Sequence, residues 1–279
     1  MRDKIVLITG ATAGIGKATA IGLAKKGANI VIVGRNAAKA QKAVDEIKQE
    51  SGNGDIHFLT ADLSSIKSVK QLVEDFKANY THLDVLINNA GAVYNQLEKS
   101  VDGIEMQIAT NHIAPFVLTN GLLDMLKAAP QGRIVNVASN AHYLYKSINW
   151  DDIYMSKGYD GLKMYAQTKL FNVLFTMEMA EHLKGTKVTV NALHPGFVRT
   201  EIGNKHGGLF YKIMWTLGSV FAISVEKGAA TSIYLASSPD VANENGKYWA
   251  NSKHKWQSYY SQTEGLKEKL WAETEKLVK

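Results

Sequence analysis

Residues 4–16 read KIVLITGATAGIG, a short apolar run that leads directly into a glycine-rich turn. A run of this length, rich in β-branched residues and closed by glycine, is typical of a buried strand. Gly10, Gly14 and Gly16 allow unusual backbone angles and let the main chain approach a ligand closely. The amphipathic stretch that follows, to about Lys26, predicts a helix whose N-terminus favours an anion such as a diphosphate. A dinucleotide site is therefore expected here, and a tight strand–helix connection that binds nothing is the alternative.

The same strand–helix pattern recurs along the chain. Short apolar runs occur at residues 5–8, 29–33, 56–59, 85–87, 133–137 and 188–192, with amphipathic stretches between most of them. Continuous apolar runs, rather than alternating ones, predict strands that are buried on both faces. We expect a single α/β domain over residues 1–279, a doubly wound Rossmann-type fold with a central, mainly parallel seven-stranded sheet and helices on both faces.

Composition narrows the class of protein. The chain has 279 residues, 46% hydrophobic and 21% charged, which is ordinary for a globular protein. It has no cysteine, which excludes disulfides, thiolate nucleophiles and cysteine metal sites. The histidines lack metal-ligand spacing, so we expect no catalytic metal and interpret His112, His142 and His194 as packing or pocket residues. The net charge is +6, but basic and acidic residues alternate on helical faces, which indicates a solvated surface rather than a nucleic-acid site.

Membrane and targeting signals are weak. The first apolar run begins at residue 4, which leaves no room for a signal peptide ahead of it. The longest apolar stretch, residues 209–225, contains Lys212 and is shorter than the roughly 20 apolar residues that a spanning helix needs. We expect a cytoplasmic protein without a transmembrane anchor, with peripheral lipid contact by this stretch left open.

The end of the second apolar run distinguishes between two dinucleotides. An acidic residue at this point would bind the ribose hydroxyls of NAD, whereas Gly34-Arg35-Asn36 presents a guanidinium suited to a 2′-phosphate. NADP(H) is therefore preferred over NAD(H). Lys17 could add a second positive charge, and a solvent-facing helix lysine is an equally good interpretation.

Tyr165 and Lys169 are four residues apart in a helical stretch, so they share one face and the ammonium can lie beside the phenol. A neighbouring cation favours the phenolate, so we expect a pKa below 10 for Tyr165 and a role in proton exchange. Ser139 follows the fifth apolar run, and strand ends of this kind line the ligand edge of an open α/β sheet. The local alternatives are surface packing for Tyr165, solvation for Lys169 and a plain strand end for Ser139.

Taken in order, these motifs resemble the short-chain dehydrogenase/reductase family across nearly the whole chain. The matching positions are residues 9–16, Asp62-Leu63, Asn88-Asn89-Ala90-Gly91, Asn111, Ser139, Tyr165 with Lys169, Pro195-Gly196 and Thr200. The resemblance implies hydride exchange between NADP(H) and a carbonyl or alcohol. It implies that Tyr165 gives a proton to the developing alkoxide, that Lys169 stabilises the phenolate and that Ser139 orients the carbonyl. Asn111 would hold a water that connects the lysine to solvent.

The resemblance also implies which residues bind the cofactor. Asp62 and the turn at Asn89 would flank its adenine side, and Pro195 with Thr200 its nicotinamide side. The full predicted cofactor set is Gly10, Thr12, Gly14, Ile15, Gly16, Arg35, Asn36, Asp62, Leu63, Asn89, Ala90, Gly91, Tyr165, Lys169, Pro195, Gly196, Val198 and Thr200. The local alternatives are a helix cap for Asp62 and an ordinary loop for Pro195-Gly196.

Residues 165–175, 190–196 and 246–248 are similar to the retinol dehydrogenase-like branch of the family. This likeness implies apolar aldehydes or ketones, such as retinoid-like or lipid-derived molecules, as substrates. Residues 200–224 are expected to form an apolar substrate lid, with simple helix packing as the alternative. Reduction of acyl-carrier, steroid or quinone carbonyls stays open, as does a non-catalytic NADP-sensing protein on the same fold. Related enzymes often form homodimers or homotetramers through the helix that bears the Tyr/Lys pair, and we expect the same here.

Overall fold

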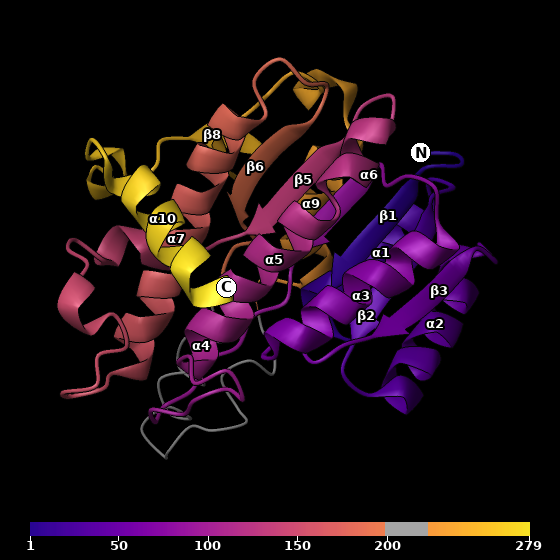
Figure 1. The fold of residues 1–279 in the computed structure, drawn as a ribbon. Helices are drawn as coiled ribbons and strands as arrows, with labels where there is room; N and C mark the ends of the chain where they lie inside the picture. The colour runs from indigo at the N-terminus through magenta and orange to yellow at the C-terminus, as the bar shows by residue number, and fades with distance from the viewer. Residues whose placement is uncertain (199–222) are drawn as a thin grey trace.

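The structure is a computed structural model that describes residues 1–198 and 223–279 (Figure 1). In this described part, eight strands form one sheet in the order β3-β2-β1-β4-β5-β6-β7-β8, with every pair parallel except the last. The strands are β1 (Ile5–Thr9), β2 (Asn29–Gly34), β3 (Ile56–Thr60), β4 (Val85–Asn88), β5 (Arg133–Val137), β6 (Thr189–His194), β7 (Tyr248–Ala250) and β8 (Lys253–Lys255). The predicted doubly wound parallel fold is confirmed.

The predicted strand number was one too low because of β8. This strand is joined to β7 by Asn251 and Ser252, whose φ angles of 52° and 55° are those of a tight hairpin turn. Its three residues are all exposed and two of them are lysines. A strand with no buried face leaves no apolar run in the sequence, and for this reason the pattern did not reveal it.

Two helical layers cover the sheet, as Figure 1 shows. The described helices are α1 (Gly14–Ala24), α2 (Ala37–Ser51), α3 (Ile66–Asn79), α4 (Met106–Ile108), α5 (Ala114–Gly121), α6 (Leu123–Ala128), α7 (Gly161–His182), α9 (Val225–Ser237) and α10 (Leu266–Val278). Alternate strand residues point to opposite faces: Leu7 packs with the layer of α3, α5, α7 and α10, whereas Val6 and Ile8 pack with that of α1, α2 and α9.

A single π-turn, Ala109–Ile113, interrupts the helix between α4 and α5. Together these three pieces form one continuous helical stretch in which one turn is wider than the rest. Such turns are rare and occur often at functional sites, because the extra residue changes the direction in which side chains project. Asn111 and His112 lie on this turn and are both buried.

The C-terminal helix α10 packs on the outer side of α7 (Figure 1). Leu266 and Leu270 of α10 are buried in the same core cluster as Phe171 and Phe175 of α7. Part of the α7 surface on which an oligomer contact is expected is therefore covered by the chain itself, and the oligomeric state stays a prediction. Among residues 1–198 and 223–279, no helix is long and apolar enough to span a bilayer.

Candidate active site

In the glycine turn after β1, the backbone lies very close to the turn that follows β4. Gly10 has a φ of +65°, and a Cβ on it would lie 2.9 Å from the Cα of Ala90. A Cβ on Gly16 would lie 2.5 Å from Nδ2 of Asn89. Both positions exclude any larger residue, because the turn after β4 presses directly against the turn after β1.

Thr9 and Asn89 join these two turns. The Thr9 hydroxyl accepts the backbone N–H groups of Asn89 and Ala90, both at 3.0 Å. In return the Asn89 side-chain amide donates to the carbonyls of Thr9 at 2.8 Å and Gly10 at 3.2 Å. The predicted residues at Gly10 and Asn89 thus form one rigid unit. Thr9 was missed as a site residue, because its hydroxyl contacts residues 80 positions away in the sequence.

Helix α1 begins at this turn without a side-chain cap. Its N-cap residue is Ala13, which accepts no hydrogen bond through its side chain. In contrast, five other helices of the described residues are capped by polar side chains: α2 by Asn36, α3 by Ser65, α4 by Glu105, α7 by Asp160 and α9 by Ser224. An uncapped helix start leaves backbone N–H groups free for an anion. The turn at Gly14–Gly16 can therefore hold a diphosphate.

Arg35 follows β2 and is exposed next to this turn. A Cβ on Gly34 would lie 2.5 Å from Cγ2 of Thr12, so the end of β2 and the glycine turn are in contact. Asn36 accepts the backbone N–H of Lys39 at 2.9 Å and so caps α2 in addition to any role toward a ligand. Lys17 forms an ion pair with Glu46 at 2.7 Å, which favours its interpretation as a surface helix lysine.

Asp62 lies after β3, where its carboxylate accepts from the backbone N–H of Ser64 at 3.0 Å and from the Ser64 hydroxyl at 2.7 Å. Its own N–H donates to the hydroxyl of Ser68 at 2.9 Å. Leu63 packs against the core. Asp62 therefore shapes the turn that leads into α3, and the helix cap itself is Ser65.

The predicted catalytic residues come together at the carboxyl end of β5. Lys169 donates from Nζ to the carbonyl of Val137, the last residue of β5, at 2.9 Å. Its Nζ lies 5.4 Å from the ring centroid of Tyr165 on the same helix. The side chain of Ser139, two residues beyond Val137, lies close enough to the Tyr165 phenol to lower its pKa. Ser139, Tyr165 and Lys169 thus form one cluster.

Burial dominates the titration of this cluster. It raises the pKa of Tyr165 to about 12, while the nearby Ser139 side chain lowers that pKa by a smaller amount. Burial also lowers the pKa of Lys169 to about 8. The expectation of a Tyr165 pKa below 10 was therefore wrong. The Lys169 ammonium donates one N–H to the Val137 carbonyl. Burial disfavours both the phenolate of Tyr165 and the ammonium of Lys169.

Asn111, which is on the π-turn, lies beside Lys169 of α7. Its Nδ2 donates to the carbonyl of Ala92 at 2.9 Å and to the hydroxyl of Thr168 at 3.1 Å, and its Oδ1 accepts the N–H of Ala92 at 2.8 Å. A Cβ on Gly91 would lie 3.4 Å from Lys169 Nζ and 3.6 Å from Asn111 Oδ1. Asn111 therefore links the turn after β4 to the helix that carries the Tyr/Lys pair. Thr168 and Ala92 are contacts that the sequence did not reveal.

The loop after β6 closes over the start of α1. Gly196 has a φ of +91°, and Val198 forms a bridge with Ile223. A Cβ on Gly228 would lie 2.5 Å from Cγ2 of Val198 and 3.4 Å from Cγ1 of Ile15. Pro195 and Val198 thus lie close to Gly228 and to Ile15 of the glycine turn, and their contact with the nicotinamide side of the cofactor stays a prediction. Thr200 lies outside the described residues, and so does the predicted lid apart from residues 223 and 224.

Two further side chains, absent from the predicted set, anchor the segment after Ser139. His142 Nε2 accepts the N–H of Ser258 at 3.2 Å, so its proton is on Nδ1 and is donated to the carbonyl of Ser139 at 2.7 Å. Tyr248 donates its hydroxyl proton to Oδ1 of Asn140 at 3.0 Å. The contacts between His142 and Ser258 and between Tyr248 and Asn140 join residues more than 100 positions apart, so no local pattern indicates them.

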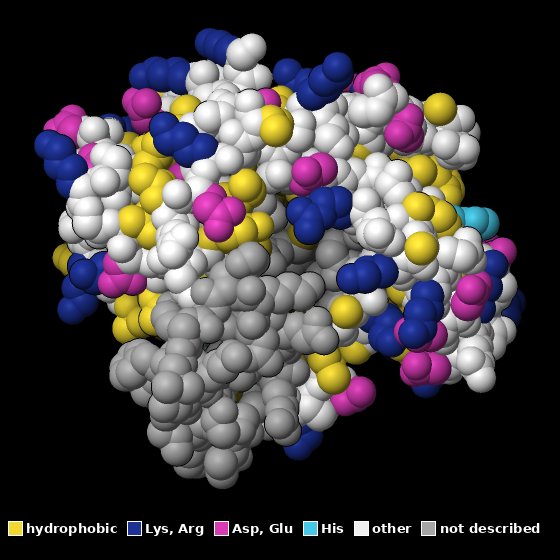
Figure 2. Space-filling model, turned by 90° about the horizontal axis from the view of Figure 1, so that it is seen from below, with side chains coloured by type: hydrophobic (Ala, Val, Ile, Leu, Met, Phe, Trp, Pro, Cys, Tyr) yellow, Lys and Arg dark blue, Asp and Glu magenta, His cyan; other side chains and the backbone are white. Residues whose placement is uncertain are grey.

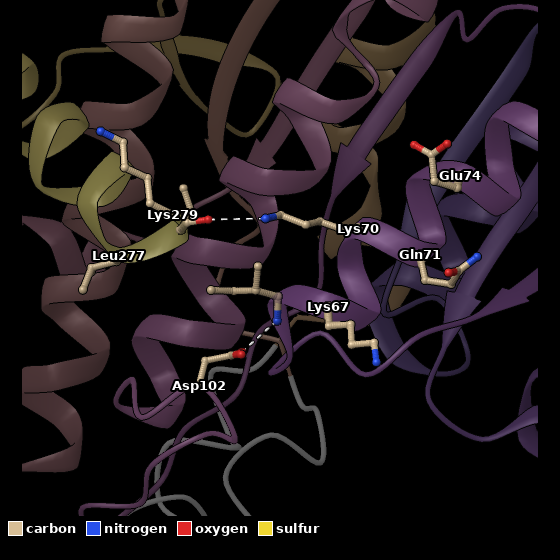
Figure 3. Close-up of a pocket in the computed structure, with 9 residues that line it drawn as sticks. Lys67, Lys70, Gln71, Glu74, Asp102, Leu277 and Lys279 are labelled. Atoms are coloured by element: carbon tan, nitrogen blue, oxygen red, sulfur yellow. Dashed lines mark hydrogen bonds between the residues drawn. The ribbon is translucent and has the colours of Figure 1, made fainter.

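A separate groove lies away from this cluster. It has a volume of about 750 Å³ and runs between α3 and the end of α10 (Figure 3). Lys70 Nζ donates to the carbonyl of Val278 across it at 3.4 Å, and Asp102 accepts the N–H of Ile66 at 2.8 Å. It contains none of the predicted residues, and most of its lining side chains are charged or polar. Its size alone therefore does not make it the reaction site.

Charge on the described surface is mixed. On the face seen from below, Lys and Arg side chains lie close to Asp and Glu side chains (Figure 2). Among residues 1–198 and 223–279, no three His, Asp or Glu side chains are grouped so that they could hold a metal ion.

Comparison with known proteins agrees with this geometry. The short chain dehydrogenase family matches residues 4–207. Retinol dehydrogenase 14 from Homo sapiens is 40% identical, over 100% of this chain and 87% of its own length. Retinol dehydrogenase 12 from Homo sapiens is 39% identical, over 96% of this chain and 84% of its own length.

Solved structures share the fold. An uncharacterized protein from Mycobacterium Paratuberculosis superposes with a TM-score of 0.79 at 29% identity, covering 99% of this chain and 94% of its own. A protein from Beutenbergia cavernae, assigned as an NAD(P) dependent gluconate 5-dehydrogenase and solved with bound NADP at low occupancy, has a TM-score of 0.73 at 25% identity, covering 90% and 96%. The chain therefore belongs to the short-chain dehydrogenase family, is similar to its retinol dehydrogenases, and is an oxidoreductase acting on carbonyl or alcohol groups.

Proposed function

We propose that the protein reduces apolar aldehydes or ketones with NADPH, and oxidises the corresponding alcohols with NADP. The observation that carries this proposal is the cluster of Ser139, Tyr165 and Lys169 at the end of β5. The turn after β4 connects this cluster to the glycine turn, because its Ala92 bonds to Asn111 at 2.8 and 2.9 Å and its Asn89 and Ala90 donate to Thr9, both at 3.0 Å.

The reaction needs a proton donor next to the carbonyl oxygen. Because burial raises the pKa of Tyr165 to about 12, its phenol is protonated at neutral pH and can give its proton to the developing alkoxide. The Ser139 hydroxyl, next to that phenol, orients the carbonyl. Lys169 stabilises the phenolate that is left, because its ammonium lies 5.4 Å from the ring. NADPH supplies the hydride when bound.

The proposed preference for NADP(H) rests on Arg35. Arg35 is exposed and follows β2 beside the glycine turn. Residues Gly34-Arg35-Asn36 include no acidic residue that could bind the ribose hydroxyls of NAD, whereas the guanidinium suits the 2′-phosphate of NADP. The Beutenbergia cavernae protein with bound NADP supports the same choice. Residues of the turn at Gly14–Gly16 would hold the diphosphate, because α1 has no side-chain cap.

The substrate class is proposed from the relatives. Retinol dehydrogenases 14 and 12 match 96% or more of the chain, and retinol is a largely apolar alcohol. The exposed Phe197, next to the glycine at 196, adds apolar surface beside the loop that closes over α1. Retinal-like and other long-chain aldehydes are therefore the first substrates to test.

The central experiment is Tyr165→Phe, measured by NADPH consumption with a panel of aldehydes and ketones. We expect kcat to fall at least about 100-fold, since a positioned general acid contributes about 10²–10⁴. The Kd for NADPH should stay within about twofold, because the ring and its packing are kept. Tyr259→Phe is the control, since Tyr259 is 94% exposed. Turnover by Tyr165→Phe equal to that of wild type would contradict the mechanism, and no NADPH consumption by the wild-type protein would favour a nucleotide-sensing role.

A further inference from the structure

We infer that His112 is a positioning residue: its hydrogen bond to Thr274 of α10 holds the π-turn in the geometry that places Asn111 beside Gly91 and Lys169. The C-terminal helix thereby becomes part of the active-site support, although none of its residues reaches the reacting groups. This inference rests on the proposed function, and one of its tests does not depend on turnover.

The π-turn needs support from outside the helix. A π-turn is less favourable than the regular α-helical turn, so surrounding contacts must stabilise it. Asn111 and His112 are consecutive residues of this turn that contact opposite neighbours. Asn111 bonds to Ala92 and Thr168, whereas His112 bonds to Thr274. Because the two residues share a peptide unit, a change in the position of one moves the other.

The direction of the His112 bond follows from proton counting. The hydroxyl of Thr274 donates its single proton to the carbonyl of Leu270 at 2.7 Å. The 2.8 Å contact between that hydroxyl and His112 must therefore use a proton on Nε2 of the imidazole. Burial lowers the pKa of His112 to about 3, so the ring is neutral at working pH and carries that one proton.

This bond controls the orientation of the ring. Within residues 1–198 and 223–279, the Nδ1 atom of His112 has no hydrogen-bond partner. Three apolar rings also lie around the imidazole: between centroids, Phe171 is 5.2 Å away, Phe175 6.3 Å and Phe116 6.5 Å. Aromatic contacts of this kind fill space but tolerate rotation of the imidazole. The hydroxyl of Thr274 is thus the polar contact that selects one orientation.

Helix α10 has its own attachment to the domain, so it can act as a fixed support. Trp271 lies 4.8 Å from the ring of Phe116 and stacks 4.2 Å from that of His182. Lys267 forms an ion pair with Glu178 of α7 at 2.7 Å. Loss of the Thr274 hydroxyl alone should therefore leave α10 docked, and the effect should appear in the π-turn.

The first test compares Thr274→Val, Thr274→Ser and wild type by amide hydrogen exchange, followed by mass spectrometry of peptides covering residues 106–114. Valine has nearly the shape of threonine but cannot accept the imidazole proton, whereas serine keeps the hydroxyl. We expect exchange about tenfold faster in Thr274→Val and at the wild-type rate in Thr274→Ser. Wild-type exchange in Thr274→Val, or fast exchange in both variants, would overturn the inference.

The second test measures kcat and KM for carbonyl reduction with NADPH. Thr274→Val and His112→Phe should each lower kcat about tenfold with KM changed less than twofold, and the double variant should be no worse than either. Lys267→Gln is the matched control, because it weakens α10 docking on the Glu178 side without touching His112, and its kcat should stay within twofold. An equal loss in Lys267→Gln would mean that general loosening of α10 is the cause, which refutes positioning by His112. If wild type shows no turnover, the proposed function fails, and hydrogen exchange still decides the inference.

Discussion

Replacing Lys169 with methionine removes a cation that the fold buries, and we expect the variant to be more stable than wild type at pH 7 while it loses carbonyl reduction. Lys169 is 3% exposed, and its Nζ donates to the Val137 carbonyl at 2.9 Å. Within the described residues, no carboxylate forms an ion pair with it. The buried ammonium of Lys169 therefore lowers the stability of the fold, although carbonyl reduction requires it.

The size of this cost follows from the pKa. Burial lowers the pKa of Lys169 from 10.5 to about 8. At about 1.4 kcal/mol for each pH unit, the charged side chain destabilises the folded state by about 3 kcal/mol. Methionine has a similar length and no charge, but it gives up the hydrogen bond to Val137, which is worth about 1 kcal/mol. The net expectation is that Lys169→Met raises the free energy of unfolding by about 2 kcal/mol at pH 7.

The pH dependence gives a second criterion. Below pH 8 the lysine is charged in both the folded and the unfolded state, so the full cost is present. Above pH 10.5 it is neutral in both states, so the cost is gone. Wild type therefore gains stability relative to Lys169→Met as pH rises from 8 to 10.5, and the advantage of the variant should shrink over that window.

The assay is urea unfolding followed by tryptophan fluorescence at pH 7 and pH 10. Lys163→Met is the matched control, since Lys163 lies on the same helix with its side chain 73% exposed, and we expect less than about 0.5 kcal/mol from it. A Lys169→Met protein less stable than wild type at pH 7 would refute the reasoning. So would an advantage that is the same size at both pH values.

Three further outcomes follow from the site. Arg35→Ala should raise the KM for NADPH about 10- to 100-fold and change that for NADH less than about twofold, because a charge-assisted bond to a phosphate is worth about 1.5–3 kcal/mol; equal effects on both cofactors would argue against a 2′-phosphate contact. Gly10→Ala should lose more stability in urea than Gly52→Ala, because both have a left-handed φ but only at Gly10 would the Cβ meet a neighbour, at 2.9 Å. The kcat/KM for reduction should fall as pH rises through about 8, where Lys169 loses its proton, and a profile level to pH 10 would show that its charge is not needed.

Much of the fold could be predicted because buried parallel strands leave a direct trace in the sequence. The central strands are covered on both faces, so most of their residues are apolar; in β4 all four residues are buried and three of them are apolar. β8 has no covered face and left no such trace. The π-turn was also missed, because a single widened turn changes no residue type and depends on contacts with Ala92 and Thr274.

The sequence by itself determined which chemical groups are present and in what order. It placed a glycine turn after β1, an arginine after β2 and a phenol one helical turn from an ammonium, because these choices depend on short-range geometry. Only the tertiary structure decided how those groups titrate and what holds them. The Tyr165 pKa rises rather than falls, since burial and the direction of the Lys169 proton depend on β5 and on residues far away in the chain. Asn111 and His112 likewise obtain their partners from segments up to 162 residues away, and no local pattern can specify contacts that exist only after the chain has folded.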